Sequence, residues 1–446
     1  MRALGRWVVP SALALALSAC AESPPERPNV VLFVLDTVRS DALSANGHPH
    51  PLTPTIDRLA AEGANFTSAY AHSSWTKPSI ATLFTGTFPD RHKVRSSSIE
   101  IDGRLVAQKL GPRLHTMAER FLEAGYATAG FVNQVHLRPK FGFHQGFEHY
   151  DWTTGKAAHE VNDALALWLE IAPARPLFIY IHYLDPHWPY WERVEGLREA
   201  LGHLGVHPEP PRRGNQVDSW LAAGLAPGSI DGLRARYDHG VASTDVAMGQ
   251  ALEMLRAAGV LDDAVVAVTS DHGEGFLEHG KLQHGYAPYE EVLRVPLVIR
   301  PPERLDIAPV VVDKPVGLVD VLPTLLDLAG LPPTREGDRG RSLVPLMRRP
   351  GAATRPIYAE VLGMRSLRSG DRKLIRYADG SIEYYDLAAD PGERTPLPCD
   401  DVCRELEAEL ELTILMAESW KDEPVDEVEL DEVDIERLRA LRYMSD

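Results

Sequence analysis

The clearest pattern in the chain is a series of uninterrupted apolar runs. They cover residues 30–35, 127–132, 177–184, 264–269 and 294–299. An apolar run of this length without polar alternation is typical of a strand that is buried on both faces of a parallel sheet. Helical periodicity separates the runs, over residues 53–63, 76–86, 114–124, 157–171 and 237–258. This alternation predicts an α/β fold with a central, mostly parallel sheet sandwiched by helices.

The pattern changes after about residue 345. Short strands with tight turns are predicted over residues 357–361, 367–369, 373–377 and 382–387, followed by a helix over 403–418. Asp379-Gly380 is a strong hairpin signal between the last two strands. We therefore expect an α/β domain over residues 29–345, a small antiparallel α+β subdomain over 346–420, and an acidic tail over 421–446 that ends in a short helix and presents a solvated face. Residues 191–232 are rich in Pro and Gly and read as an insertion that roofs a site.

The N-terminus has the layout of an export signal. Two arginines precede an apolar stretch over residues 7–16, and Leu17-Ser18-Ala19-Cys20 follows. This ending resembles a bacterial lipobox, although an ordinary cleaved signal peptide remains the alternative. The resemblance implies a signal peptide over 1–19, lipidation of Cys20 and a polar tether over 20–28. We therefore expect an exported lipoprotein anchored on the periplasmic side of the cell envelope.

Composition narrows the class of partner. Of the 446 residues, 44% are hydrophobic and 25% charged, which is ordinary for a globular protein with a large core. The net charge of −18 argues against a nucleic acid, because phosphate contacts need a basic face. It does not exclude a small anionic substrate, since a metal ion can set the local field.

Besides Cys20 the chain has only Cys399 and Cys403. In an exported protein these two residues favour a disulfide over free thiols. Two cysteines without a nearby histidine make a poor zinc site.

The stretch around Thr76 predicts a loop that turns into a short helix. Pro78 suits the first helical turn, Ile80 and Leu83 belong to one apolar face, and Gly86 stands where a C-cap belongs. Thr76 is then expected just before the helix N-terminus, where the free N–H groups favour an anion. Its hydroxyl either caps the helix, or binds a metal ion, or attacks an anionic ester.

Metal-capable side chains follow three of the predicted strands. Asp36 ends the first, Asp185 and His187 follow another, and Asp271 and His272 follow a third. In open parallel α/β sheets, ligands bind beyond the carboxyl ends of the strands. The mixed Asp and His ligands favour Zn or Mn over Ca, which prefers oxygen ligands, with Mg as a further alternative.

Several long motifs carry a resemblance to a known family. In chain order they are PNVVLFVLDTVRSDAL, TPTIDRLAAEGANFTSAYA, KPSIATLFTGTFPDRH, DPHWPY, SDHGEGFLEHG, YEEVLRVPLVIRPP, LVDVLPTLLDLAGL and YYDLAADPGE. The chain resembles the sulfatase family within the alkaline phosphatase superfamily of metal-dependent hydrolases, over nearly its whole length. The resemblance implies an alkaline phosphatase-like fold and hydrolysis of an ester bond with one or two divalent ions.

The resemblance also implies roles for individual residues. Asp36, Asp271 and His272 become metal ligands, and Thr76 becomes a nucleophile bound to the same ion. His187 matches a histidine that contacts the substrate or protonates the leaving group. His284 lies where relatives place a substrate-binding or second-metal residue. The alternatives of one ion, or of a second ion held by Asp185, His187 and His284, both stay open.

The chain departs from the sulfatase pattern at its most informative motif. Sulfatases carry Cys or Ser in C/S-x-P-x-R and oxidise it to formylglycine, whereas residues 76–80 here read TKPSI. Thr37 and His272 replace a usual Asp and Asn. An unmodified Thr resembles the phosphodiesterase and phosphoglycerol transferase branches. We therefore expect cleavage of a phosphate mono- or diester of a small-molecule or envelope substrate. The alternatives are a sulfatase without formylglycine and a non-catalytic envelope binding protein.

Other polar residues near these motifs are weaker candidates. Lys77 and Asn133 are expected to bind substrate, and His136 and Lys140 could also touch it. His182 reads either as a core residue or as part of the site. For the remaining residues we expect Glu274 to orient His272 or to be structural, Lys281 to be solvated, and Arg39 and Asp41 to form a salt bridge.

Overall fold

The computed structural model describes residues 27–95, 99–101, 104–152, 157–188, 190, 229–418, 420 and 423–440. The predicted signal peptide, Cys20 and residues 191–228 of the predicted insertion lie outside the described residues. Within the described part, no helix has both the length and the apolar character that crossing a membrane requires.

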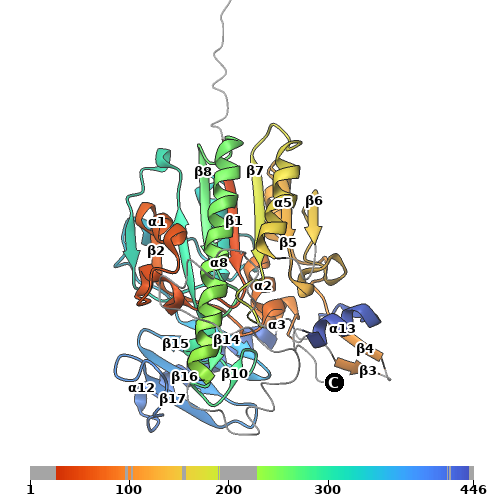
Figure 1. The fold of residues 1–446 in the computed structure, drawn as a ribbon. Helices are drawn as coiled ribbons and strands as arrows, with labels where there is room; N and C mark the ends of the chain where they lie inside the picture. Colours follow the sequence, from red (N-terminus) through yellow and green to blue (C-terminus); the bar gives the residue numbers. More distant parts are fainter. Residues whose placement is uncertain are drawn as a thin grey trace, which may run out of the picture.

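A nine-stranded sheet forms the centre of the molecule (Figure 1). Its middle is parallel and has the order β8-β1-β7-β5. The bounds of these strands are Ala264–Thr269, Asn29–Leu35, Leu177–Tyr183 and Ala127–Val132. They agree closely with four of the apolar runs. The expectation of a mostly parallel sheet is therefore confirmed.

The outer strands complete the sheet. β11 (Arg294–Arg300) runs antiparallel to β8 and to β2 (Ala64–Tyr70). β12 (Val310–Val312) and β13 (Val316–Gly317) lie beside β2, and β6 (His149–Trp152) lies at the far edge beside β5. The pattern of apolar runs does not predict β2 and β6, because the composition of these strands is mixed.

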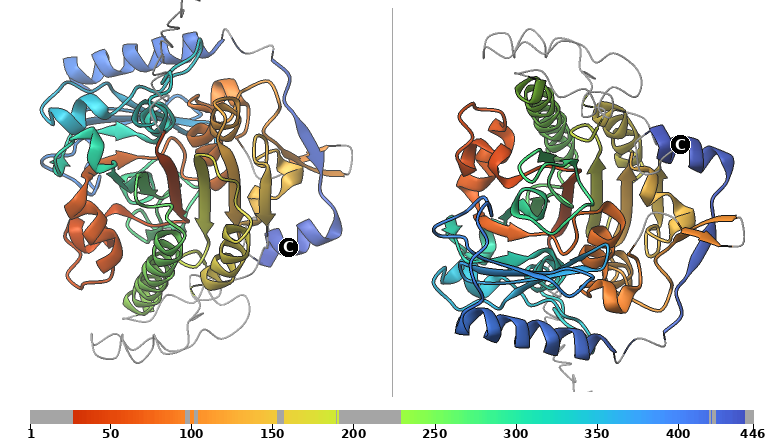
Figure 2. Two further views of the ribbon diagram at one scale, coloured as in Figure 1. Left: turned by 90° about the horizontal axis from the view of Figure 1, so that it is seen from above. Right: turned by 90° about the horizontal axis from the view of Figure 1, so that it is seen from below.

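Helices cover both faces of the sheet (Figures 1 and 2). On β1, Val30, Leu32 and Val34 belong to one buried apolar cluster, and Val31, Phe33 and Leu35 belong to another. This alternation follows the two-residue period of a strand. One face is covered by α1 (Pro54–Glu62), α5 (Ala158–Leu169) and α8 (Ser229–Ala257), and the other by α2 (Thr76–Thr85), α4 (Met117–Glu123) and α10 (Val321–Leu328).

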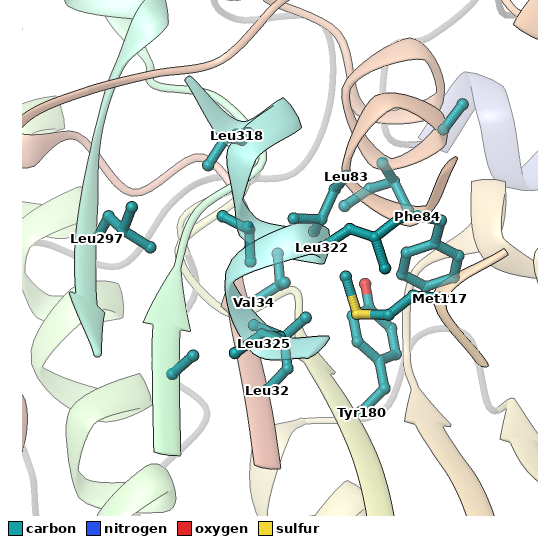
Figure 3. Packing of buried hydrophobic residues seen from close by; sticks show 14 of the residues in the cluster. Leu32, Val34, Leu83, Phe84, Met117, Tyr180, Leu297, Leu318, Leu322 and Leu325 are labelled. Atoms are coloured by element: carbon teal, nitrogen blue, oxygen red, sulfur yellow. The ribbon is translucent and has the colours of Figure 1, made fainter. Parts of the chain in front are cut away.

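Helix α2 is buried along its whole length. Leu83 and Phe84 pack against Leu322 of α10 and towards Tyr180 of β7 (Figure 3). The rings of Phe84 and Tyr180 meet edge to face, with their centroids 4.9 Å apart. Gly86 ends the helix in a left-handed conformation, with φ of 64°. This packing fixes α2, and hence Thr76 at its first turn, against the carboxyl half of the sheet.

The C-terminal subdomain lies below the central sheet in Figure 1. Its antiparallel sheet consists of β14 (Ile357–Val361), β15 (Met364–Ser369), β16 (Arg372–Arg376) and β17 (Ile382–Asp386). Helix α12 (Asp401–Glu418) packs on this sheet, and a disulfide joins Cys399 to Cys403 at its start. The predicted α+β subdomain is confirmed.

A buried ionic network joins this subdomain to the rest of the chain. Glu290 accepts from Arg368 at 2.8 Å and from Lys373 at 3.1 Å. Lys373 also pairs with Glu393 at 2.8 Å. Arg368 and Lys373 of the subdomain therefore both have Glu290 as a charged partner across the boundary, and these two ion pairs hold the subdomain in one orientation.

The acidic tail differs from its prediction. Residues 427–429 form β18, which pairs with β4 (Arg104–Gln108), and α13 (Glu432–Ala440) follows. Asp434 is fully buried and forms ion pairs with Arg138 and Lys140. The expectation of a merely solvated face is wrong at this residue, because its cations are supplied by a distant part of the chain.

We expect Phe84→Ala to lower the free energy of unfolding by about 3–5 kcal/mol, because it removes a ring from a fully packed core. Urea denaturation followed by circular dichroism measures this loss. The matched control is Leu412→Ala on α12, where the side chain is 62% exposed. It should change stability by less than about 0.5 kcal/mol. Equal losses in both variants would contradict this account of the core.

Candidate active site

Three neighbouring strands bring the candidate residues to one edge of the sheet. β8, β1 and β7 are adjacent, and their registers place Thr269, Val34 and His182 side by side. Asp271 and Asp36 therefore emerge next to each other at the carboxyl edge. The sequence placed these residues at strand ends, and the sheet order makes the strands neighbours.

The Asp36 carboxylate is fully buried and held by hydrogen bonds on one oxygen. Its Oδ2 accepts from Gln134 Nε2 at 2.5 Å and from His182 Nε2 at 3.0 Å. With its proton on Nε2, His182 accepts at Nδ1 from the Tyr180 hydroxyl, 2.8 Å away. Asp36 Oδ1 has no hydrogen-bond partner in the described part of the chain. His182 therefore belongs to the site, as a support for Asp36.

Asp271 is held in a similar way from the neighbouring strand. Its Oδ1 accepts from the backbone N–H of Thr37 at 3.1 Å and of His272 at 2.9 Å. Its buried Oδ2 has no hydrogen-bond partner among the described residues and lies 3.3 Å from His272 Nε2. Both carboxylates thus keep one oxygen available on the inside of the site.

The geometry also fixes the tautomer of His272. Its Nδ1 lies 3.0 Å from the Gly273 carbonyl oxygen and donates to it. Nε2 is then an acceptor, and it lies 3.1 Å from Thr76 Oγ1. Thr76 and His272 therefore meet through the two atoms that could bind a metal ion or exchange a proton.

Thr76 is the first residue of α2, and the preceding Trp75 is the N-cap. The expectation that Thr76 lies just before the helix is therefore wrong by one residue. The alternative that Thr76 is the N-cap also fails. The Thr76 hydroxyl is buried at the helix N-terminus, where the helix dipole stabilises negative charge.

Sequence analysis gave no role to Thr37, which adopts a strained conformation beside the site. Its φ of 61° is rare for a β-branched residue, and it is fully buried. Its Oγ1 has no hydrogen-bond partner in the part of the chain that the structure describes. In this conformation the backbone N–H of Thr37 donates to Asp271 Oδ1 at 3.1 Å.

Asp36, Asp271 and His272 fit a divalent metal ion. Ligand atoms of Asp36, Asp271 and His272 all lie within 4.8 Å of one another. Burial and the Asp36 carboxylate raise the pKa of Asp271. Burial also acts against ionisation of Asp36, but the hydrogen bond from His182 and the nearby His187 lower its pKa below the usual value. Two buried carboxylates this close are stabilised by a cation between them.

Three histidine rings form a row along the site. The His284 ring lies 4.3 Å from that of His272 and 5.0 Å from that of His187. His284 Nδ1 lies 3.0 Å from Glu274 Oε1. Burial lowers the pKa of His187 to about 4 and raises that of Glu274 to about 7. The expectation that Glu274 orients His272 is wrong, since Glu274 contacts His284 instead.

The residues proposed for a second metal are not gathered into such a group. Asp185 Oδ1 accepts at 3.1 Å from the backbone N–H of Ala158, at the start of α5. The cluster of Asp36, Asp271 and His272 is the single group of three ligands that the described residues bring within 4.8 Å. The geometry therefore favours one ion, with His187 and His284 beside it.

Lys77 and Asn133, which are expected to bind substrate together with His284, are both buried. The Lys77 ammonium donates to the Gln108 carbonyl oxygen at 2.9 Å and lies 5.1 Å from the centre of the Phe141 ring. Burial lowers the pKa of Lys77 to about 7. Asn133 comes directly after β5, next to Gln134. Their binding of substrate stays a prediction.

The remaining charged candidates either form ion pairs within the protein or are exposed to solvent. Arg39 pairs with Asp41 at 2.8 Å and with Glu278 at 2.5 Å, so the salt-bridge expectation is confirmed. Lys281 is exposed, as expected. Lys140 pairs with Asp434 in the tail, which is a structural partner in place of substrate.

One wall of the site depends on a glycine. The φ of Gly285 is 79°, and a Cβ there would lie 1.9 Å from the Trp75 ring. Trp75 in turn meets His284, with ring centroids 6.0 Å apart. Only glycine lets the His284 loop pass so close to the N-cap of α2.

Comparisons with known proteins identify the family of this chain. The model of the family described as "Sulfatase" matches residues 28–331, and that described as "N-sulphoglucosamine sulphohydrolase, C-terminal" matches residues 278–419. The chain belongs to the sulfatase family. It is therefore an ester-bond hydrolase of a metal-dependent family, and the resemblance seen in the motifs is confirmed.

Individual relatives show how broad the family is. An ulvan-active sulfatase of Formosa agariphila is 26% identical, over 84% of this chain and 78% of its own length. A structure in complex with its substrate D-glucosamine-2-N,6-O-disulfate superposes with a TM-score of 0.73, at 21% identity, over 90% of this chain and all of the other. The structure of the phosphonate monoester hydrolase of Agrobacterium radiobacter superposes with a TM-score of 0.69, at 22% identity, over 89% of this chain and 96% of the other.

We expect Asp271→Asn to have opposite effects with and without metal. Without metal it should raise the free energy of unfolding by on the order of 1 kcal/mol at neutral pH, because it removes a buried charge beside Asp36 while the amide oxygen keeps both N–H contacts. Mn²⁺ at about 100 times its Kd should stabilise the unmodified protein by about 2.7 kcal/mol and the variant far less.

Thermal unfolding after chelation, and again with added Mn²⁺, measures both effects. Glu409→Gln, an exposed change on α12, is the matched control and should leave both values unchanged. A variant that keeps the full metal-induced shift would show that Asp271 is not a ligand.

Proposed function

We propose that the chain hydrolyses an anionic ester of a tetrahedral oxyanion, with the Thr76 hydroxyl as the nucleophile. The observation that carries this proposal is the position of Thr76 Oγ1. It lies at the N-terminus of a buried helix and 3.1 Å from His272 Nε2, beside Asp36 and Asp271. An unmodified hydroxyl in this place needs only activation to act as a nucleophile.

Asp36, Asp271 and His272 would hold the metal ion, with the hydroxyls of Thr76 and Thr37 beside it. When bound, such an ion lowers the pKa of a coordinated hydroxyl and offsets negative charge on the transferred group. Its identity is part of the proposal: we favour Zn²⁺ or Mn²⁺, because the ligands mix carboxylate with imidazole.

Thr76 Oγ1 would attack the central sulfur or phosphorus, losing its proton and forming a covalent ester. The bond to the leaving oxygen breaks, and that oxygen takes up a proton to leave as an alcohol. Water then cleaves the Thr76 ester and releases the oxyanion. The N-terminus of α2 stabilises negative charge during both steps.

His187 is our candidate for the proton donor to the leaving oxygen. Its Nδ1 donates to the Trp188 carbonyl oxygen at 2.5 Å, so Nε2 is the ring nitrogen that would transfer the proton. Burial lowers the pKa of His187 in the free protein, whereas a bound anionic ester favours the protonated ring. His284 is positioned beside both His187 and His272 to contact the substrate.

Two classes of ester compete for the role of substrate. The sequence favours a phosphate ester as the substrate, because Thr76 cannot be oxidised to formylglycine. The relatives support a sulfate ester more strongly, since most of them are named as sulfatases. The phosphonate monoester hydrolases among the structural neighbours keep the phosphorus esters as the second candidate. We therefore propose a sulfate monoester as the first candidate and a phosphorus ester as the second.

We also propose that a lipid at Cys20 anchors the enzyme to a bacterial envelope. The support is the lipobox-like sequence at residues 17–20. The substrate would then be a small molecule or an envelope component. The described chain begins at Arg27, so about seven residues connect the anchor to the fold.

Thr76→Val should abolish turnover, with a fall in kcat of at least about 10³-fold, because it removes the nucleophile and keeps the shape of the side chain. Thr76→Ser should retain activity within roughly tenfold, since it keeps the hydroxyl. The assay compares nitrophenyl sulfate, nitrophenyl phosphate, bis-nitrophenyl phosphate and nitrophenyl phenylphosphonate with Mn²⁺ and with Zn²⁺.

Fastest turnover of the sulfate would support the first candidate, and fastest turnover of a phosphorus ester would support the second. Equal activity of Thr76→Val and the unmodified protein would exclude Thr76 as the nucleophile. If no ester is cleaved and no metal binds, the chain is a binding protein on a sulfatase scaffold.

A further inference from the structure

The C-terminal helix α13 contacts the loop that supports the metal site. Asp434, in the first turn of α13, is fully buried, and its two oxygens pair with Arg138 and Lys140. Asp431, just before the helix, also pairs with Lys140, at 3.3 Å. Nearly 300 residues separate these partners in sequence, at spacings of 296 and 294 residues.

The carboxylate of Asp434 is held in one orientation by the helix start itself. The N–H of Asp434 donates to Asp431 Oδ1 at 2.8 Å, and the N–H of Asp431 donates to Asp434 Oδ2 at 3.1 Å. These reciprocal bonds satisfy two donors at the helix N-terminus. Asp434 therefore presents a fixed anion to the loop of residues 134–141.

At its other end the same loop supports Asp36. Gln134 caps the turn Val135–Leu137, because its Oε1 accepts from the His136 N–H at 3.3 Å. Its Nε2 donates to Asp36 Oδ2 at 2.5 Å. This contact leaves Asp36 Oδ1 for a metal ion. Arg138 follows that turn directly, and Lys140 lies in the next turn, Pro139–Phe141.

We propose that Asp434 is a positioning residue for the metal site, acting through Arg138 and Lys140 on the loop that carries Gln134. The inference rests on the proposed function, because it names the metal site as what the contact serves. Fixing both basic side chains fixes the two turns after Gln134, and Gln134 then holds Asp36 in the orientation that suits a ligand.

The tail is attached to the molecule independently of Asp434. β18 pairs with β4 through Val428 and its neighbours, and Leu430 and Leu438 are buried in the main core. Removing the Asp434 charge therefore leaves the tail in place and isolates the effect of the ion pairs. A purely structural contact would change stability and leave metal affinity unchanged.

The test compares Asp434→Asn with the matched control Glu436→Gln, an exposed change on the same helix. Mn²⁺ affinity of the full chain is measured by titration calorimetry, without substrate. Hydrogen exchange of the amides of residues 135–141 is measured alongside. We expect Asp434→Asn to weaken Mn²⁺ binding by about 3- to 30-fold and to speed exchange in the loop, and Glu436→Gln to change neither.

Lys140→Gln is the second variant, because it removes one of the two ion pairs and keeps the buried carboxylate. It should weaken Mn²⁺ binding less than Asp434→Asn does, and Asp434→Glu should recover part of the loss. Unchanged Mn²⁺ affinity in Asp434→Asn, whatever its stability, would overturn the inference.

The measured Mn²⁺ affinity does not depend on which reaction the site catalyses. If the protein binds Mn²⁺ but cleaves none of the esters, the proposed function is contradicted. The positioning of Asp36 is then still tested by the Mn²⁺ affinity of the variants. A chain that cleaves an ester with the same Mn²⁺ affinity in both variants would contradict the positioning role alone.

Discussion

Two buried carboxylates at the carboxyl edge of the sheet are the constraint on which the site depends. Asp36 and Asp271 come from adjacent strands, and each is held by hydrogen bonds on one oxygen only. Their mutual repulsion in a buried place is unfavourable unless a cation lies between them. The αL conformation of Thr37 serves these two groups, because it brings a backbone N–H to Asp271.

The residues that hold Asp36 and Thr76 in position come from several different elements of the fold. His182 of β7 contacts Asp36 and is itself held by the Tyr180 hydroxyl, and Gln134 contacts Asp36 from the loop after β5. Helix α2 packs on the face of the sheet that α4 and α10 also cover, and this packing holds Thr76 in place. The fold therefore acts as a rigid frame, and the chemistry is confined to a few side chains at one edge.

A threonine at position 76, where the sulfatase motif has Cys or Ser, gives the candidate site its distinct character. The chain belongs to a metal-dependent family of ester hydrolases. In the function that we propose, the Thr76 hydroxyl acts as a nucleophile without prior oxidation. The rings of His187, His284 and His272 lie in a row beside it and would surround the bound ester.

The sequence by itself determined the fold class, the strand ends and the ligand candidates, because apolar runs and the polar residues that follow them are local signals. It did not reveal β2 or β6, whose mixed composition carries no apolar run, nor the docking of the tail, whose partners Arg138 and Lys140 lie nearly 300 residues away. The role of Gln134 was missed, because its amide gains a role only when the fold brings the Asp36 carboxylate to it. The tertiary structure also decided that Asp185 caps α5 and that Glu274 serves His284, because a carboxylate binds whichever donor the packing places within reach.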